Sequence, residues 1–210
     1  MNAPSLTKQQ KRFRIVAAAE KLFSHEGVEK VTMNHIAQEA KVGKGTLYLY
    51  FKSKEELYST ILVKAFDRLE AYFQEVYQKT LSGYEKVIQL AHAYLQFALQ
   101  EPHYFDAILH YQNSSFDFDR LAEAPENAKA VQRGADLMQQ IIQVIKTGQD
   151  DTSINPALQV EEVAFIIWGQ LTGVLQIIKK KMDLVNYLQP LKVDRLLETQ
   201  LLFIQKTLRN

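Results

Sequence analysis

The segment around residues 44–54 places amine, hydroxyl and phenol donors at intervals that suit contacts with a phosphate backbone. These donors are Lys44, Thr46, Tyr48, Tyr50 and Lys54. Leu47 and Phe51 alternate with them and are spaced to anchor the same short helix from its other side. Thr32 starts the preceding helical pattern, where its hydroxyl and nearby N–H groups would hold a phosphate. Donors at these positions would bind backbone oxygens on both sides of a major groove, which indicates contacts with double-stranded DNA.

The sequence offers few candidate residues for a catalytic, metal or cofactor site. The chain has no cysteine, which excludes disulfides, thiolate catalysis and cysteine-bound metal. No serine–histidine–acid order, nucleophile elbow or dinucleotide fingerprint is present. His103, Asp106 and His110 share a helix face, but a spacing of seven separates the two histidines by about 10 Å along the axis. We therefore expect these residues to line a pocket or face a partner, and we expect no enzyme activity, metal or cofactor.

The elements that position these residues are expected to be helices throughout. The chain of 210 residues has only 8 glycines and 5 prolines, about half of ordinary usage. Apolar residues at helical spacing predict an all-α fold of about nine helices. Three short helices before residue 52 have helix-turn-helix dimensions, with a tight turn at 41–43. Ser53 and Glu56 form a capping-box pattern that opens a long fourth helix. Further helices are expected at 84–100, 103–112, 126–147, 157–181 and 191–208, with loops at 113–118 and 148–155.

Charge divides the chain into two parts. Residues 1–52 contain nine Lys/Arg and four acidic residues, whereas the remainder contains 16 basic and 20 acidic residues. This asymmetry favours a small polyanion-binding domain at 1–52 and a larger domain at 53–210. The most apolar stretch, 163–178, is interrupted by Gln170, Thr172 and Gln176 and falls short of the ~18 apolar residues that span a membrane. No secretory signal is visible, so we expect a cytoplasmic protein without a membrane partner.

Two strings in the N-terminal part carry a specific resemblance. Residues 31–37 read VTMNHIA, and residues 42–57 read VGKGTLYLYFKSKEEL. Together they closely resemble the DNA-binding domain of the TetR family of transcriptional regulators, over about residues 10–57. The resemblance implies a homodimer that binds a palindromic operator, and a divergent C-terminal domain whose small-molecule effector releases the DNA.

The resemblance also implies roles for individual residues. Those expected to contact phosphate are Thr32, Tyr48, Tyr50 and Lys54. Those at the groove-entering end of the recognition helix are Lys44, Gly45 and Thr46, while Asn34 and Leu49 are placed to reach bases. Two positions depart from the family pattern. Lys41 replaces the usual glycine of the turn, which predicts a strained left-handed lysine at roughly 1–2 kcal/mol, and Gly43 replaces the usual serine cap.

Aromatic residues concentrate in the middle of the chain. Aromatic walls with a few polar groups are typical of small-molecule pockets. The residues expected to line such a pocket are Tyr94, Phe97, His103, Tyr104, Phe105, His110, Tyr111, Phe116, Trp168 and Gln170. Basic residues are sparse between 90 and 170, which favours a largely apolar effector of drug or lipid size.

The last two expected helices are more apolar than one neighbour requires. Gly169 and Gly173 lie four residues apart, which indicates close helix approach. We expect a two-fold dimer seam formed by Ile167, Gly169, Leu171, Gly173, Val174, Leu197, Leu201 and Ile204. The alternative is that both helices bury these residues inside one protomer.

The leading interpretation is a ligand-responsive DNA-binding regulator, most simply a repressor. A helical small-molecule binding or interaction protein without specific DNA binding is the alternative. A third interpretation, an all-α enzyme, has no candidate residues.

Overall fold

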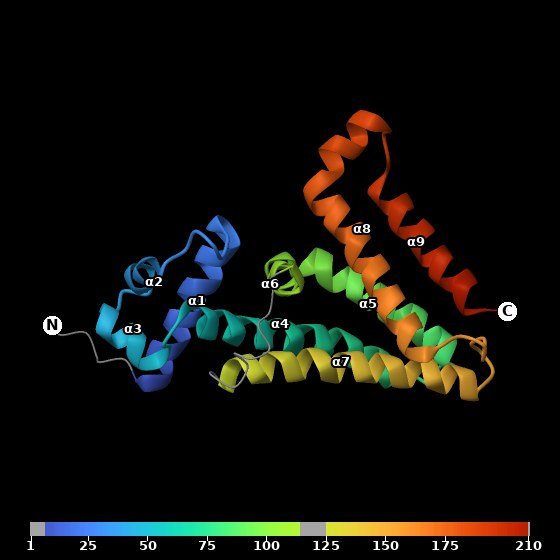
Figure 1. Cartoon of the computed structure of the whole chain (residues 1–210), viewed down its shortest axis with the longest axis horizontal. Helices are drawn as coiled ribbons and strands as arrows, with labels where there is room; N and C mark the ends of the chain where they lie inside the picture. Colours follow the sequence, from blue (N-terminus) through green and yellow to red (C-terminus); the bar gives the residue numbers. More distant parts are fainter. Residues whose placement is uncertain (1–6, 114–124, 210) are drawn as a thin grey trace. The chain divides into compact units, whose positions relative to one another are not determined.

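The computed structural model describes residues 7–113 and 125–209, and those residues form nine α-helices and no strand (Figure 1). The helices are α1 (Lys8–Glu26), α2 (Met33–Glu39), α3 (Lys44–Tyr50), α4 (Lys54–Tyr77), α5 (Gly83–Gln100), α6 (Pro102–Asn113), α7 (Pro125–Asp150), α8 (Val160–Leu188) and α9 (Val193–Leu208). The all-α class predicted from the composition is confirmed. The expected loop at 113–118 falls almost entirely outside the described residues.

The chain divides into two compact units. The first contains Met1–Asp67 and His103–Arg133, and the second contains Arg68–Pro102 and Gly134–Asn210. Each unit is therefore built from two stretches of sequence, and α4 and α7 each contribute to both. The boundary that we placed between residues 52 and 53 stays a prediction.

Side-chain caps fix where the helices of the first unit begin. Thr7 and Gln10 form a reciprocal capping box at α1, and the Thr32 hydroxyl accepts from the His35 N–H at α2. The Ser53 hydroxyl accepts from the Glu56 N–H at 3.1 Å, as its sequence pattern predicts. The Glu56 carboxylate reaches back one residue further, to the Lys52 N–H at 2.7 Å. These bonds satisfy N–H groups that have no partner inside a helix.

In the second unit, α5 contacts both α8 and α9, and α8 contacts α9. The start of α5 lies against the end of α7, because a Cβ on Gly83 would lie 2.2 Å from the Gly148 backbone. The Gly83 N–H donates to the Asp151 carboxylate at 2.7 Å, and Asp151 also accepts from Ser153. The Ser153 side chain, followed by the Gly83 N–H, lowers the pKa of Asp151. Two glycines and one carboxylate therefore set this junction.

The bounds of two helices, α7 and α8, differ most from the prediction. Helix α7 continues through Gly148 to Asp150, because the turn that follows is organised by Asp151 and Ser153 rather than by the glycine. Helix α8 begins at Val160 and extends to Leu188, whereas the sequence pattern predicts 157–181. The run of lysines at 179–181 does not end it, and no glycine or proline follows before Pro190.

Helix α8 is longer than the apolar stretch 163–178 that the sequence analysis compared with a membrane span. Among the described helices, α8 alone is long and apolar enough, by length and composition, to cross a membrane, with a mean hydropathy of 1.2 over its best window. The shorter stretch considered from the sequence falls below that criterion. The core helix of a folded domain passes the same test, and α8 buries Val163, Ala164, Ile167, Leu171 and Leu175 inside the second unit.

Candidate nucleic-acid interface and ligand cavity

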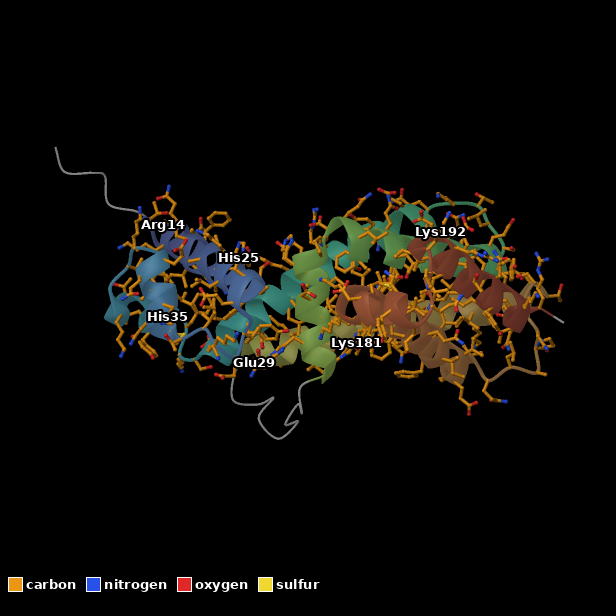
Figure 2. All side chains as sticks on the ribbon, turned by 90° about the horizontal axis from the view of Figure 1, so that it is seen from above. Arg14, His25, Glu29, His35, Lys181 and Lys192 are labelled. Carbon is orange, nitrogen blue, oxygen red and sulfur yellow. The ribbon has the colours of Figure 1, made fainter. Side chains whose placement is uncertain are left out.

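Hydrogen bonds from residues of the first unit fix the turn between α2 and α3. The Val42 N–H donates to the Ala37 carbonyl at 3.0 Å, and the Arg14 guanidinium of α1 donates to the Ala40 carbonyl at 2.7 Å. Lys41 has a φ of 52°, so the predicted left-handed lysine is confirmed. Arg14 and His35, labelled in Figure 2, mark α1 and α2 of this arrangement. The result is a fixed angle between α2 and α3, as a helix-turn-helix requires.

Helix α3 has one buried side and one open side. Leu47 is fully buried and Phe51, its C-cap residue, is nearly so, which anchors the helix as the sequence spacing predicts. On the open side Leu49 is 85% exposed and Tyr48 is 43% exposed, and Lys44 and Gly45 are exposed beside them. Thr46 and Tyr50 are half-buried, while Thr32 and Asn34 at the start of α2 are exposed. The structure thus presents the predicted groove-entering residues on one accessible surface.

Lys54 has a role inside the chain that sequence reasoning missed. Its ammonium group donates to the carbonyl oxygens of Val28 at 2.7 Å and Glu29 at 3.4 Å, in the connection between α1 and α2. The same connection is held by His110 of α6, whose Nδ1 lies 3.1 Å from the Glu29 carboxylate. A lysine ammonium has three donors, so Lys54 can bind this connection and still keep a donor for a phosphate.

An apolar cavity of about 30 Å³ lies in the second unit. Two predicted pocket residues, Tyr94 and Trp168, line it, and the Tyr94 hydroxyl is hydrogen-bonded to Thr172 at 2.9 Å. The sequence analysis did not single out the other lining residues, which are Phe73, Val87, Leu90, Ala91, Ile141, Ala164, Ile167 and Leu171. Their signal is the ordinary apolar stripe of an amphipathic helix, which does not separate a cavity wall from a filled core.

The other predicted pocket residues do not line this cavity, and their role in ligand binding stays a prediction. Phe97 is fully buried against the Tyr72 ring, and Gln170 is exposed. The residues that belong to the first unit rather than to the unit with the cavity are His103, Tyr104, Phe105, His110 and Tyr111. Phe116 lies outside the described residues. Sequence proximity grouped these aromatics, but α6 places its residues in the other unit.

The environment of α6 explains where its aromatic and polar residues go. Tyr111 lies edge-on to Phe66, and His110 lies edge-on to Tyr58. The Tyr58 hydroxyl donates to the Ala107 carbonyl, and burial raises the pKa of Tyr58. The His103 ring lies against the Tyr104 ring at a tilt of 42°. In the described part of the chain no group of three or more His, Cys, Asp or Glu residues could hold a metal ion.

The structure divides the predicted dimer seam into two sets. Ile167, Leu171, Leu201 and Ile204 are buried inside their own chain, so we correct their assignment and place them in the core of the second unit. Val174 and Leu197 are half-buried, and a Cβ on Gly169 or Gly173 would meet nothing within 4 Å. The large apolar side chains exposed on α8 and α9 include Phe165, Ile166, Ile177, Leu202 and Phe203.

Comparisons with known proteins agree with this architecture. Residues 15–61 match the family model of bacterial regulatory proteins of the tetR family. Residues 87–201, more than half of the chain, match the model of the tetracyclin repressor-like C-terminal domain. The two matched segments contain α2 and α3 and most of the second unit, respectively.

Individual relatives match more locally. The HTH-type transcriptional regulator SAUSA300_2515 of Staphylococcus aureus is 39% identical over 87 residues, which is 41% of this chain. That match spans less than half (46%) of the length of the curated relative.

Solved structures resemble the chain over nearly its whole length. The ketosteroid transcriptional regulator KstR2 of Mycobacterium tuberculosis has a TM-score of 0.69 at 21% identity, covering 99% of this chain and 98% of that one. The fatty acid degradation regulator FadR of Bacillus halodurans has a TM-score of 0.68 at 19% identity, covering 98% and 100%. At these identities the likeness shows the fold. Taken with the family models and the open face of α3, it shows that the chain belongs to the TetR family of transcriptional regulators and carries a helix-turn-helix DNA-binding domain.

Proposed function

We propose that the protein is a ligand-responsive repressor that binds a palindromic operator as a homodimer and is released by a small, largely apolar effector. The observation that carries this proposal is the pairing of two features in one chain. The first unit presents an open recognition face on α3, and the second unit contains a cavity with almost wholly apolar walls. We place this regulator in the cytoplasm, where it would meet its DNA.

The character of the cavity supports the class of effector. Its walls are aliphatic and aromatic, and the hydroxyl of Tyr94 is already bonded to Thr172. None of the described residues that line it is a lysine or an arginine, so these walls offer no group to hold a phosphorylated or polyanionic metabolite. Two structural neighbours are named for ketosteroids and for fatty acid degradation. Those names agree with a lipophilic effector for this chain.

The open faces of α8 and α9 support the homodimer. Phe165 and Ile166 are exposed one turn before Gly169 on α8, and Gly169 and Gly173 leave room for a second helix. Helix α9 exposes Leu202 and Phe203 as well. A two-fold seam would also give two recognition helices, which a palindromic site requires at a spacing of about 34–36 Å or a multiple of it.

Binding of the intergenic DNA upstream of the protein's own gene tests the proposal. We expect a gel shift whose stoichiometry is two chains per site, with loss of the shift when a steroid or a long-chain fatty acid is added. A shift that no lipophilic compound releases would contradict the effector class. Equal affinity for that DNA and for random duplex would contradict operator recognition.

A further inference from the structure

We propose that Leu49 reads the 5-methyl group of a thymine in each operator half-site. This inference rests on the proposed operator binding and names the chemistry by which α3 would recognise its bases. A single exposed leucine on a protein surface is ordinary. The position of Leu49, in the helix that enters the groove, makes its 85% exposure informative.

The first step of the argument is the composition of α3. The stretch 41–52 reads KVGKGTLYLYFK and has no arginine, asparagine, glutamine, aspartate or glutamate. Those are the side chains that read base edges through paired or accepting hydrogen bonds. Lys44 is the one flexible donor at the start of the helix, and Thr46 is half-buried. Apart from Lys44, Thr46 and the two tyrosines, the side chains with which α3 can contact bases are therefore apolar.

The second step is the shape of the open face. Gly45 and Leu49 are four residues apart and lie on the same side of the helix. A Cβ on Gly45 would meet nothing within 4 Å, so the packing of the chain does not require glycine there. Without a side chain at 45, Leu49 is the most prominent group on this side, next to Tyr48. The bare position lets the helix approach the groove closely enough for a leucine to touch a base edge.

The third step is what an aliphatic side chain can distinguish. In the major groove the thymine methyl is the one apolar group that a base presents, and aliphatic contacts select it. Burial of one methyl-sized group gives a discrimination of about fourfold per half-site, and about 15-fold for two half-sites in a dimer. The expected preference is therefore for thymine at a symmetrical pair of operator positions.

Thymine-to-deoxyuridine replacement tests this contact, because it removes the methyl and leaves every hydrogen-bonding group in place. The full-length protein first selects its sites from a random duplex library. Each thymine of the selected site is then replaced in turn, and affinities are measured by fluorescence anisotropy. We expect each half-site to contain one thymine whose single replacement lowers the affinity of the wild-type protein about fourfold. The Leu49→Ala variant should bind the thymine and deoxyuridine duplexes equally.

The matched control is Tyr48→Phe, which removes a hydroxyl predicted to contact phosphate. It should weaken both duplexes to the same extent and keep the thymine preference of the wild type. Leu49→Ala should unfold at the wild-type temperature, because the side chain is mostly exposed. A selected site in which no deoxyuridine replacement matters, or a preference that survives Leu49→Ala, would overturn the inference and leave operator binding intact. A library that yields no enriched sequence would overturn operator binding itself.

Discussion

Glycine has opposite roles at two positions of this chain. At Gly83 an added Cβ would lie 2.2 Å from the Gly148 backbone and 2.9 Å from the Val144 carbonyl oxygen. At Gly45 it would meet nothing within 4 Å. The first glycine is required by the junction of α5 and α7, whereas no contact among the described residues requires the second.

We therefore expect Gly83→Ala to lower the free energy of unfolding by roughly 3 kcal/mol, because backbone rather than a mobile side chain blocks the methyl group. Gly45→Ala should raise it by up to about 0.5–1 kcal/mol, because alanine is the better helix residue. Thermal denaturation of the two variants beside the wild type checks both signs. Equal effects would show that the backbone at Gly83 moves aside freely.

Lys54 is engaged with the carbonyls of Val28 and Glu29, and its remaining donor is predicted to bind a phosphate. We expect Lys54→Ala to weaken binding to operator and random duplex alike. The slope of log affinity against log salt should fall in magnitude by about 0.9, the value for one phosphate contact. An unchanged slope with weaker binding would show that Lys54 positions the connection between α1 and α2 without touching DNA.

At the scale of elements, α3 and its anchors follow from the sequence, whereas the partners of α8 and α9 do not. Leu47 and Phe51 occur at a spacing that leaves one helix face apolar, so the sequence determines which side is buried. Helices α8 and α9 are apolar on more than one face. Periodicity then predicts burial, but it does not say whether Leu171 and Leu201 meet their own chain or a second copy.

The same limit applies to the pocket. Tyr94 and Trp168 were found because aromatic residues stand out, while Leu90 and Ile141 resemble any core residue. The five α6 residues belong to the other unit, and a single sequence does not show that α6 packs with the N-terminal stretch of chain.

The revised seam makes a testable prediction about assembly. Phe203 is 65% exposed and Gly173 faces open space, so neither Phe203→Asp nor Gly173→Leu should unfold the protomer. Both changes should weaken the dimer, the first by placing a charge in the seam and the second by blocking close helix approach. Light scattering should give about twice 24.2 kDa for the wild type and lower values for these variants.

Phe13→Asp is the matched control for this experiment, because Phe13 is equally exposed but lies on α1 of the first unit. It should leave the mass unchanged. A dimer that tolerates both Phe203→Asp and Gly173→Leu would place the seam on another surface.

At the scale of the whole molecule, the walls of the cavity determine which compounds should stabilise the protein. We expect steroids and fatty acids to raise the unfolding temperature. At a ligand concentration one hundred times Kd, the free energy of unfolding should rise by about 2.7 kcal/mol. Sugars and phosphorylated metabolites should have no effect. Differential scanning fluorimetry on the full chain measures this, and a response to the polar compounds alone would contradict the apolar effector.

The small size of the cavity has a consequence for the sensitivity of the response. Ligand sites for drug-sized molecules occupy about 300–1,000 Å³, so about 30 Å³ is enough for little more than one methylene group. A steroid or a fatty acid is far larger than this cavity. Such an effector must therefore bind a rarer form of the second unit in which the cavity is expanded. If that form made up about 1% of molecules, the apparent Kd would be about a hundredfold weaker than the intrinsic one. The concentration at which the regulator responds is then set partly by how tightly Leu90, Ile141 and Trp168 pack when no ligand is bound. Substitutions among these residues could retune the threshold of the switch without touching either the effector's polar groups or the DNA.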